Sequence, residues 1–220
     1  MTLISEILFL LKKEATMELR QKYALSGILL YVTSTVFVIY LSFTGIKIEP
    51  NVWNTLFWIV SLFASINAVM KSFVQENSAR QLFYYQLINP IAVILSKIFY
   101  NICLLFILNV LTLVMLRVMV GNPIHDTPQY FLAILLGSIG FSITFTFVSA
   151  IAAKANNSAT MMAILSFPVV LPILITLIRL SKSAIRMVDT SWGQDVLMLG
   201  SIDMILIAMS FLLFPFLWKD

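Results

Sequence analysis

Side chains that could carry out catalysis are scarce in this sequence. Its single histidine, His125, lies in the segment GNPIHDTPQY, and its single cysteine, Cys103, lies inside an apolar run. A metal site needs several ligands, and a histidine-activated nucleophile needs a serine or cysteine beside the imidazole ring. We interpret His125 as a solvated turn residue, and we predict no catalytic residue, no metal site and no disulfide within the chain.

The sequence also lacks a recognisable source of energy. None of its seven glycines begins a GxxxxGK(S/T) loop, the usual backbone cradle for nucleotide phosphates. A proton-driven transporter places ionisable groups near mid-membrane, where they are costly and usually functional. We expect Lys71, Arg117, Arg179 and Asp203 near the ends of apolar runs, which argues against proton coupling. If ATP drives this protein, a separate subunit binds it.

The composition places these residues in a lipid environment. Hydrophobic residues make up 60% of the chain and charged residues 11%, and the mean hydropathy is +0.99. A soluble domain has roughly 25% charged residues, so this chain cannot present a wetted surface. The net charge of +4 does not indicate a nucleic-acid partner, because the basic residues flank apolar runs, where they meet lipid headgroups.

Six apolar stretches are long enough to cross a bilayer as helices. They are residues 24–43, 53–73, 98–118, 130–153, 160–178 and 201–217. Helices are favoured over barrel strands because the runs are continuously apolar, without alternation. We therefore predict an all-α integral membrane protein with six transmembrane helices and one permease domain over residues 1–220.

Basic residues predict the orientation of these helices. Nine Lys and Arg residues fall on the side of the two termini and five on the other side, which puts both termini in the cytoplasm. The fifth connection runs against this orientation, because its basic residues then lie on the outer side: Arg179, Lys182 and Arg186. Trp53 and Tyr130 begin spans on the outer side and are interpreted as belt residues at the membrane interface.

The first 23 residues predict a helix outside the spans. Apolar residues recur at helical spacing, and most charged residues lie elsewhere on the helical wheel; the apolar set is Leu3, Ile4, Ile7, Leu8, Leu11 and Ala15. This pattern is typical of an amphipathic helix in the membrane interface. Its role is either a plain surface anchor or a specific contact with a partner. The short apolar run before Lys12 does not fit a signal peptide.

Two prolines and two glycines stand out within the predicted spans. Pro168 and Pro172 lie one turn apart and should kink the fifth span, either as a bend that gates a lateral cavity or as a static kink. Gly137 and Gly140 give the fourth span a small face for close helix packing. Three mid-span asparagines are expected to bond neighbouring helices: Asn67, Asn101 and Asn109.

The longest polar interruption, QENSARQLFYYQLINPIAVILSK, predicts a cytoplasmic coupling segment over residues 75–97. Residues 75–86 could form a short surface helix, which Asn89-Pro90 ends, and Lys97 marks the start of the next span. Such a helix could sit in a groove of a partner and transmit its motion. The residues proposed for this interface are Glu76, Gln81, Leu82, Phe83, Leu87 and Pro90. The alternative is a solvated loop with belt tyrosines, Tyr84 and Tyr85.

These residues together resemble a known family. The coupling segment is similar to the corresponding loop of the haem exporter protein B (cytochrome c maturation B, CcmB) permeases, through Gln75, Glu76, Ser78, Gln81, Leu82, Leu87, Pro90 and Lys97. A second block agrees in order and spacing: Leu136-Gly137, Gly140-Phe141, Lys154, Pro168 and Pro172. The resemblance covers essentially the whole chain. Asn77, Gln86 and Ile88 depart from the family pattern.

The resemblance implies a non-catalytic permease with an ABC-2 exporter-like fold in the bacterial inner membrane. It implies partners for haem delivery in c-type cytochrome biogenesis: a cytoplasmic ABC ATPase in two copies, a haem-handling membrane subunit, a periplasmic haem chaperone and a second permease copy. ATP is then bound by the ATPase. No cofactor is expected in the chain, and haem is a possible substrate.

Alternatives remain at this point. Trp192-Gly193 is not a tryptophan-rich haem motif, so we rank transmission of force above conduction of haem, and a weak axial contact of His125 with haem is a lesser possibility. A second hypothesis is an export permease for a lipid or another hydrophobic small molecule. A third is a scaffold that assembles partners without transport.

Overall fold

The computed structural model describes residues 3–20, 22–69, 89–153, 158–186 and 192–219. Within these ranges every regular element is a helix, so the predicted all-α class is confirmed. The helices are α1 (Leu3–Arg20), α2 (Lys22–Ser42), α3 (Pro50–Val69), α6 (Pro90–Met119), α7 (Thr127–Ala152), α8 (Ser158–Arg186) and α9 (Trp192–Lys219).

Five helices are long and apolar enough to cross a membrane. They are α3, α6, α7, the Thr160–Ile185 part of α8 and the Trp192–Phe216 part of α9. The first expected span, residues 24–43, corresponds to α2, whose described apolar stretch, Ser26–Ser42, is shorter than those five. The chain is therefore membrane-embedded, with five to six apolar helices.

Local sequence accounts for where several helices begin and end. Asn89 caps α6, because its side-chain oxygen accepts a hydrogen bond of 3.0 Å from the backbone N–H of Ile91, and Pro90 occupies the first helical position. Asp126 caps α7 in the same way through the N–H of Gln129, at 3.1 Å. Gly121 follows the end of α6 with a positive φ of 111°, which a glycine adopts without strain.

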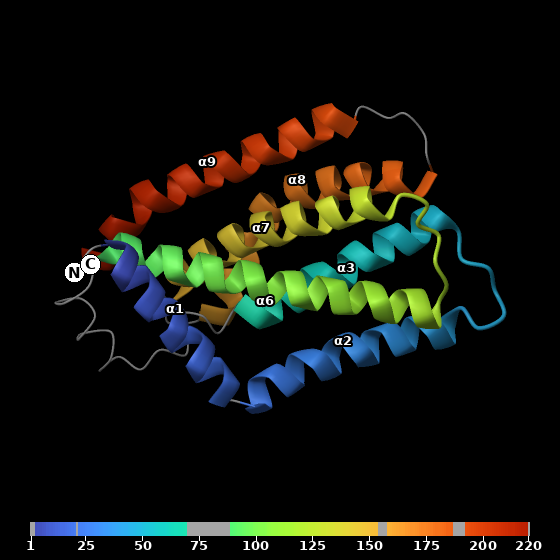
Figure 1. Ribbon diagram of the computed structural model, residues 1–220, viewed down its shortest axis with the longest axis horizontal. Coiled ribbons are helices and arrows are strands. Elements are labelled where there is room, and N and C mark those ends of the chain that lie inside the picture. Colours follow the sequence, from blue (N-terminus) through green and yellow to red (C-terminus); the bar gives the residue numbers. More distant parts are fainter. Residues whose placement is uncertain (1–2, 21, 70–88, 154–157, 187–191, 220) are drawn as a thin grey trace.

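The spanning helices run along the long axis of the molecule, and α1 crosses the bundle at one end (Figure 1). Both termini lie at this end, where α6 also begins; we call it the termini end. α7 is the most enclosed span, with 67% of its most apolar 18-residue stretch buried, against 17% of the corresponding stretch of α9. Four aromatic side chains pack edge to face around α7: Phe57, Trp58, Tyr130 and Phe141.

Three helices extend beyond the apolar runs that predicted them. α6 begins at Pro90, so Lys97 lies inside a helix and does not mark the start of a span. α8 runs to Arg186, so the three basic residues expected in the fifth connection lie on a helix. α9 begins at Trp192, which places Asp203 near the middle of a span and corrects its expected position near an end. The helices are longer than the apolar runs because backbone hydrogen bonds also form between polar residues, at which an apolar run ends.

Candidate functional site

An ion pair joins α1 to α6 at the termini end. The Lys97 side chain is 2% exposed, and its Nζ lies 3.3 Å from Oε1 of Glu14 on α1. The same carboxylate oxygen lies 3.1 Å from Nζ of Lys13. A buried ammonium is costly unless it is paired. Since Glu14 neutralises Lys97, the position of α1 on α6 is fixed by charge as well as by packing.

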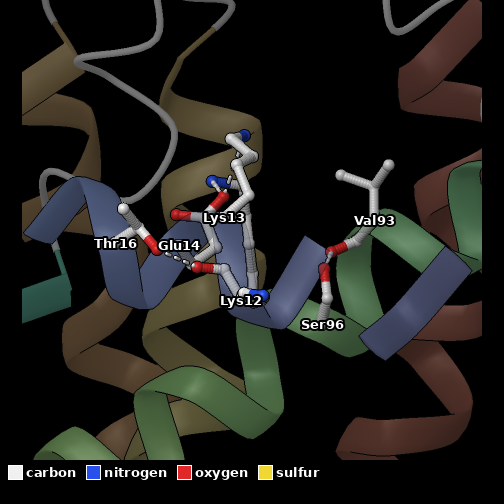
Figure 2. Close-up of polar contacts among 7 residues, drawn as sticks. Lys12, Lys13, Glu14, Thr16, Val93 and Ser96 are labelled. Carbon is white, nitrogen blue, oxygen red and sulfur yellow. Dashed lines mark hydrogen bonds and ion pairs between the residues drawn. The ribbon is translucent and has the colours of Figure 1, made fainter. Parts of the chain in front are cut away.

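Apolar packing surrounds this ion pair. Leu10 of α1 is 3% exposed and belongs to a cluster that also holds Ile98 of α6, Ile143 and Ala150 of α7, and Phe214 of α9. Figure 2 shows α1 crossing the N-terminal part of α6, with Lys13 and Glu14 on α1 and Val93 and Ser96 on α6. Through Leu10, α1 is tied to three spanning helices.

This contact defines the face of α1 that packs on the bundle. Leu10 and Glu14 share one side of the helix, one turn apart, whereas Ile4 and Leu8 are 70% and 62% exposed. Only some of the apolar residues that spacing predicted for one face of α1 therefore pack against the bundle. Its exposed members are free to face lipid, and the interfacial position of α1 remains a prediction.

The predicted coupling segment is described only at its C-terminal end. Glu76, Gln81, Leu82, Phe83 and Leu87 lie outside the described residues, as does any helix over residues 75–86. Pro90 is half-buried and starts α6. Lys97 follows Pro90 by about two helical turns. A displacement of the chain entering α6 therefore acts on a helix that is already anchored to α1.

Pro168 and Pro172 lie on the exposed side of α8, among outward-facing residues such as Phe167 and Ile175. The helix is continuous from Ser158 to Arg186 through both prolines. Val170 and Ile173 are buried on its opposite side. A gating role for these prolines thus remains a prediction, and any such bend acts at the outer face of α8.

Gly137 and Gly140 lie where α7 approaches its neighbours. A Cβ added to Gly137 would lie 2.8 Å from the Trp58 ring of α3, and one added to Gly140 would lie 2.7 Å from Oδ1 of Asp203 on α9. Real Cβ atoms do not come so close. The helices therefore reach this separation only because residues 137 and 140 have no side chain.

Buried hydrogen bonds hold the spans together, and the sequence indicated part of them. Asn101 donates to Thr146 at 2.8 Å and Asn109 to Ser138 at 3.0 Å, which confirms the prediction that they bond a neighbouring helix. Asn67 is different: its amide donates to the Phe63 carbonyl within α3, so the prediction for this residue was wrong.

A second polar cluster, among α3, α7 and α8, was missed. Tyr130 donates to Oδ1 of Asn54 at 3.2 Å, and Asn54 donates to the Ile178 carbonyl at 3.0 Å. Trp58 donates to Ser181 at 2.7 Å. Tyr130 and Trp53 are 0% and 2% exposed, so both are core residues and not belt residues. An aromatic ring at a span end fits either role, and no signal in the sequence separates them.

No group of three potential metal ligands occurs among the residues for which coordinates are described. His125 has an exposed side chain, and its backbone N–H donates to the Ala184 carbonyl at 3.2 Å. This contact ties the segment between α6 and α7 to the end of α8. The arrangement around His125 fits a turn residue.

Comparison with known proteins gives one family match. The family model described as CcmB protein matches residues 5–217 of the chain. The match includes α1, the coupling segment and every spanning helix described above. A search of curated proteins finds no match.

Proposed function

Because the chain belongs to the CcmB protein family, the haem-exporter permease components of cytochrome c biogenesis, we propose that it transmits the motion of a separate cytoplasmic ABC ATPase to haem-handling partners. The observation that carries this proposal is the Glu14–Lys97 ion pair, which joins α1 to α6 at the C-terminal end of the coupling segment. A movement applied to residues 75–89 then displaces α1 and α6 as one unit.

The location of the site supports contact from the cytoplasm. The excess of Lys and Arg on the side of the termini predicts that the termini end faces the cytoplasm, and this is where α1 and α6 meet. The sequence has no phosphate-binding loop. ATP is therefore hydrolysed by the partner, in two copies if the permease forms a homodimer. A haem-handling membrane subunit and a periplasmic haem chaperone complete the proposed assembly in the bacterial inner membrane.

A charge swap tests the proposed route of transmission. Glu14→Lys and Lys97→Glu should each uncouple ATP hydrolysis from cytochrome c maturation by about tenfold or more, because each leaves like charges facing one another inside the bundle. The double variant restores opposite charges and should recover most of the maturation. Lys12→Glu is the matched control, since Lys12 is on α1 but exposed. Full maturation in both single variants, at normal protein level, contradicts the proposal.

A second candidate function rests on a cavity. Residues of α1, α2 and α6, most of them apolar, line an open cavity of about 380 Å³, with Glu18 and Tyr100 as its polar members. Leu29, Cys103 and Ile107 line the remainder. Such a lining suits a lipid or another hydrophobic small molecule, as an export permease for such compounds requires. Copurification of the native complex, with its subunits and bound pigment identified, distinguishes this candidate from haem delivery.

A further inference from the structure

Asp203 is a carboxyl group near the middle of a membrane span. It lies on α9 between Trp192 and Phe216, and 5% of the residue is exposed. Its Oδ1 atom is buried and has no hydrogen-bond partner among the described residues. Ionisable groups at this depth are costly and rare. Asp203 therefore needs an explanation that helix packing alone does not supply.

The surroundings of Asp203 offer no compensating charge. Oδ1 packs against Gly140 of α7, close to Ile173 of α8. α9 packs mainly against α6, α7 and α8. Across their described lengths, the titratable or charged residues are Lys97, Tyr100, Cys103, Arg117, Tyr130, Arg179, Lys182 and Arg186. Among those of these side chains that the structure describes, none forms an ion pair or hydrogen bond with Oδ1 of Asp203. Lys97 is paired with Glu14, and Arg179 and Lys182 are exposed.

Two further polar atoms on α7 and α9 are buried without a partner in the described part of the chain: Thr144 Oγ1 and Ser210 Oγ. Thr144 follows Gly140 by one turn on α7, and Ser210 follows Asp203 by about two turns on α9. Both helices run toward the termini end (Figure 1). Hydroxyl groups thus continue from Asp203 along the two helices in the direction of that end.

We propose that Asp203 is an intramembrane proton-binding site. An ionised carboxylate without a partner in this apolar setting is strongly disfavoured, and a bound proton removes its charge. Thr144 and Ser210 are further buried hydroxyl groups on the same two helices, between Asp203 and the termini end. The close contact at Gly140 makes the α7–α9 packing dependent on whether Asp203 is protonated. A charged carboxylate there would require water, and the contact leaves no room for it.

Carbodiimide labelling tests this proposal on the full-length protein in membrane vesicles. Dicyclohexylcarbodiimide adds to a protonated carboxyl in apolar surroundings and gives a stable adduct without a leaving group, which peptide mass spectrometry locates. We expect an adduct on Asp203 whose yield falls as the pH rises. Asp126 is the internal control, because its carboxylate caps α7 at the backbone N–H of Gln129 and should remain unlabelled.

Infrared difference spectroscopy gives a second measurement that does not depend on access of the reagent. The two spectra compared are those of the unaltered protein and of Asp203→Asn, whose amide has nearly the same shape. The carbonyl band of a protonated carboxylic acid should be present in the first and absent in the second. Absence of this band at every pH overturns the proposal. So does protection from labelling by sodium ions at constant pH, since that result identifies a metal cation as the occupant. Neither measurement involves haem or an ATPase, so the outcome is independent of the proposed function.

Discussion

Lys97 of α6 and Glu14 of α1 form an ion pair of 3.3 Å across 83 positions of the sequence. Lys97 is almost fully buried, and Glu14 retains 13% exposure of its side chain. The pair therefore lies at the edge of the bundle, with the carboxylate still partly wetted. It connects α1, which lies outside the predicted spans, to α6, whose first turns form the end of the coupling segment, and its loss should be measurable.

Removal of one partner of this pair should lower the stability of the protein. Glu14→Gln removes the carboxylate that lies 3.3 Å from the buried ammonium of Lys97, and we expect a loss of about 3 kcal/mol. Lys97→Met combined with Glu14→Leu should lose less, because it removes both charges. Thermal unfolding in detergent measures the difference, with Lys12→Met as the exposed control. Equal stability of Glu14→Gln and the unaltered protein contradicts this assignment.

Side chains at the two close-packed glycines should be destabilising. Gly137→Ala forces the Trp58 ring to move from a contact of 2.8 Å, and overpacking of this kind costs about 1–3 kcal/mol. Gly200→Ala is the matched control, because nothing lies within 4 Å of its added Cβ. The control should be neutral, or stabilising by up to about 1 kcal/mol. The assignment is wrong if unfolding temperatures of the two variants coincide.

Loss of the Tyr130 hydroxyl should weaken the polar cluster of α3, α7 and α8. In Tyr130→Phe, Oδ1 of Asn54 loses its donor at 3.2 Å and remains buried. We expect a cost of about 1–2 kcal/mol, measured as a shift in the thermal unfolding midpoint. Tyr40→Phe serves as the control, since Tyr40 is exposed. A shift no larger than that of the control would show that the hydrogen bond contributes nothing.

Cys103 reports on the cavity among α1, α2 and α6. It is exposed, is the only cysteine, and lines this cavity with Ala15 and Leu104. We expect a lipid-soluble maleimide to label Cys103 and a charged, membrane-impermeant one to leave it unmodified. Ala15→Trp should fill the cavity and slow the reaction about tenfold. Ile46→Trp, in a connection outside this cavity, is the control. Rapid labelling by the charged reagent would place the cavity in water.

The orientation can be measured with single cysteines in a Cys103→Ala background. Lys12→Cys lies on α1 at the termini end, and Lys47→Cys lies between α2 and α3. Both native side chains are exposed. An impermeant maleimide added to intact cells should label position 47 and spare position 12, because the excess of basic residues predicts cytoplasmic termini. The reverse pattern would invert the proposed topology and place the coupling segment outside.

That this chain is helical and lies in lipid follows from its amino-acid pattern alone. Long apolar runs without alternation leave no other way to satisfy backbone hydrogen bonds in a bilayer. Local signals also determine helix starts: Asn89 and Asp126 cap α6 and α7 through their own side chains. The order and spacing of residues over nearly the whole chain pointed to the family that the match over residues 5–217 shows.

Which face of each helix contacts other helices is known only from the way the helices pack together. A spanning helix is apolar on all sides, and lipid tails are as apolar as leucine, so hydrophobicity does not distinguish a lipid contact from a helix contact. Tyr130 could thus be expected in the interface belt although it is buried in the core. Apolar runs also end at the first polar residues, whereas helices continue through them. The burial of Lys97 and the mid-span depth of Asp203 depend on that continuation, and they became apparent only with the helices packed together.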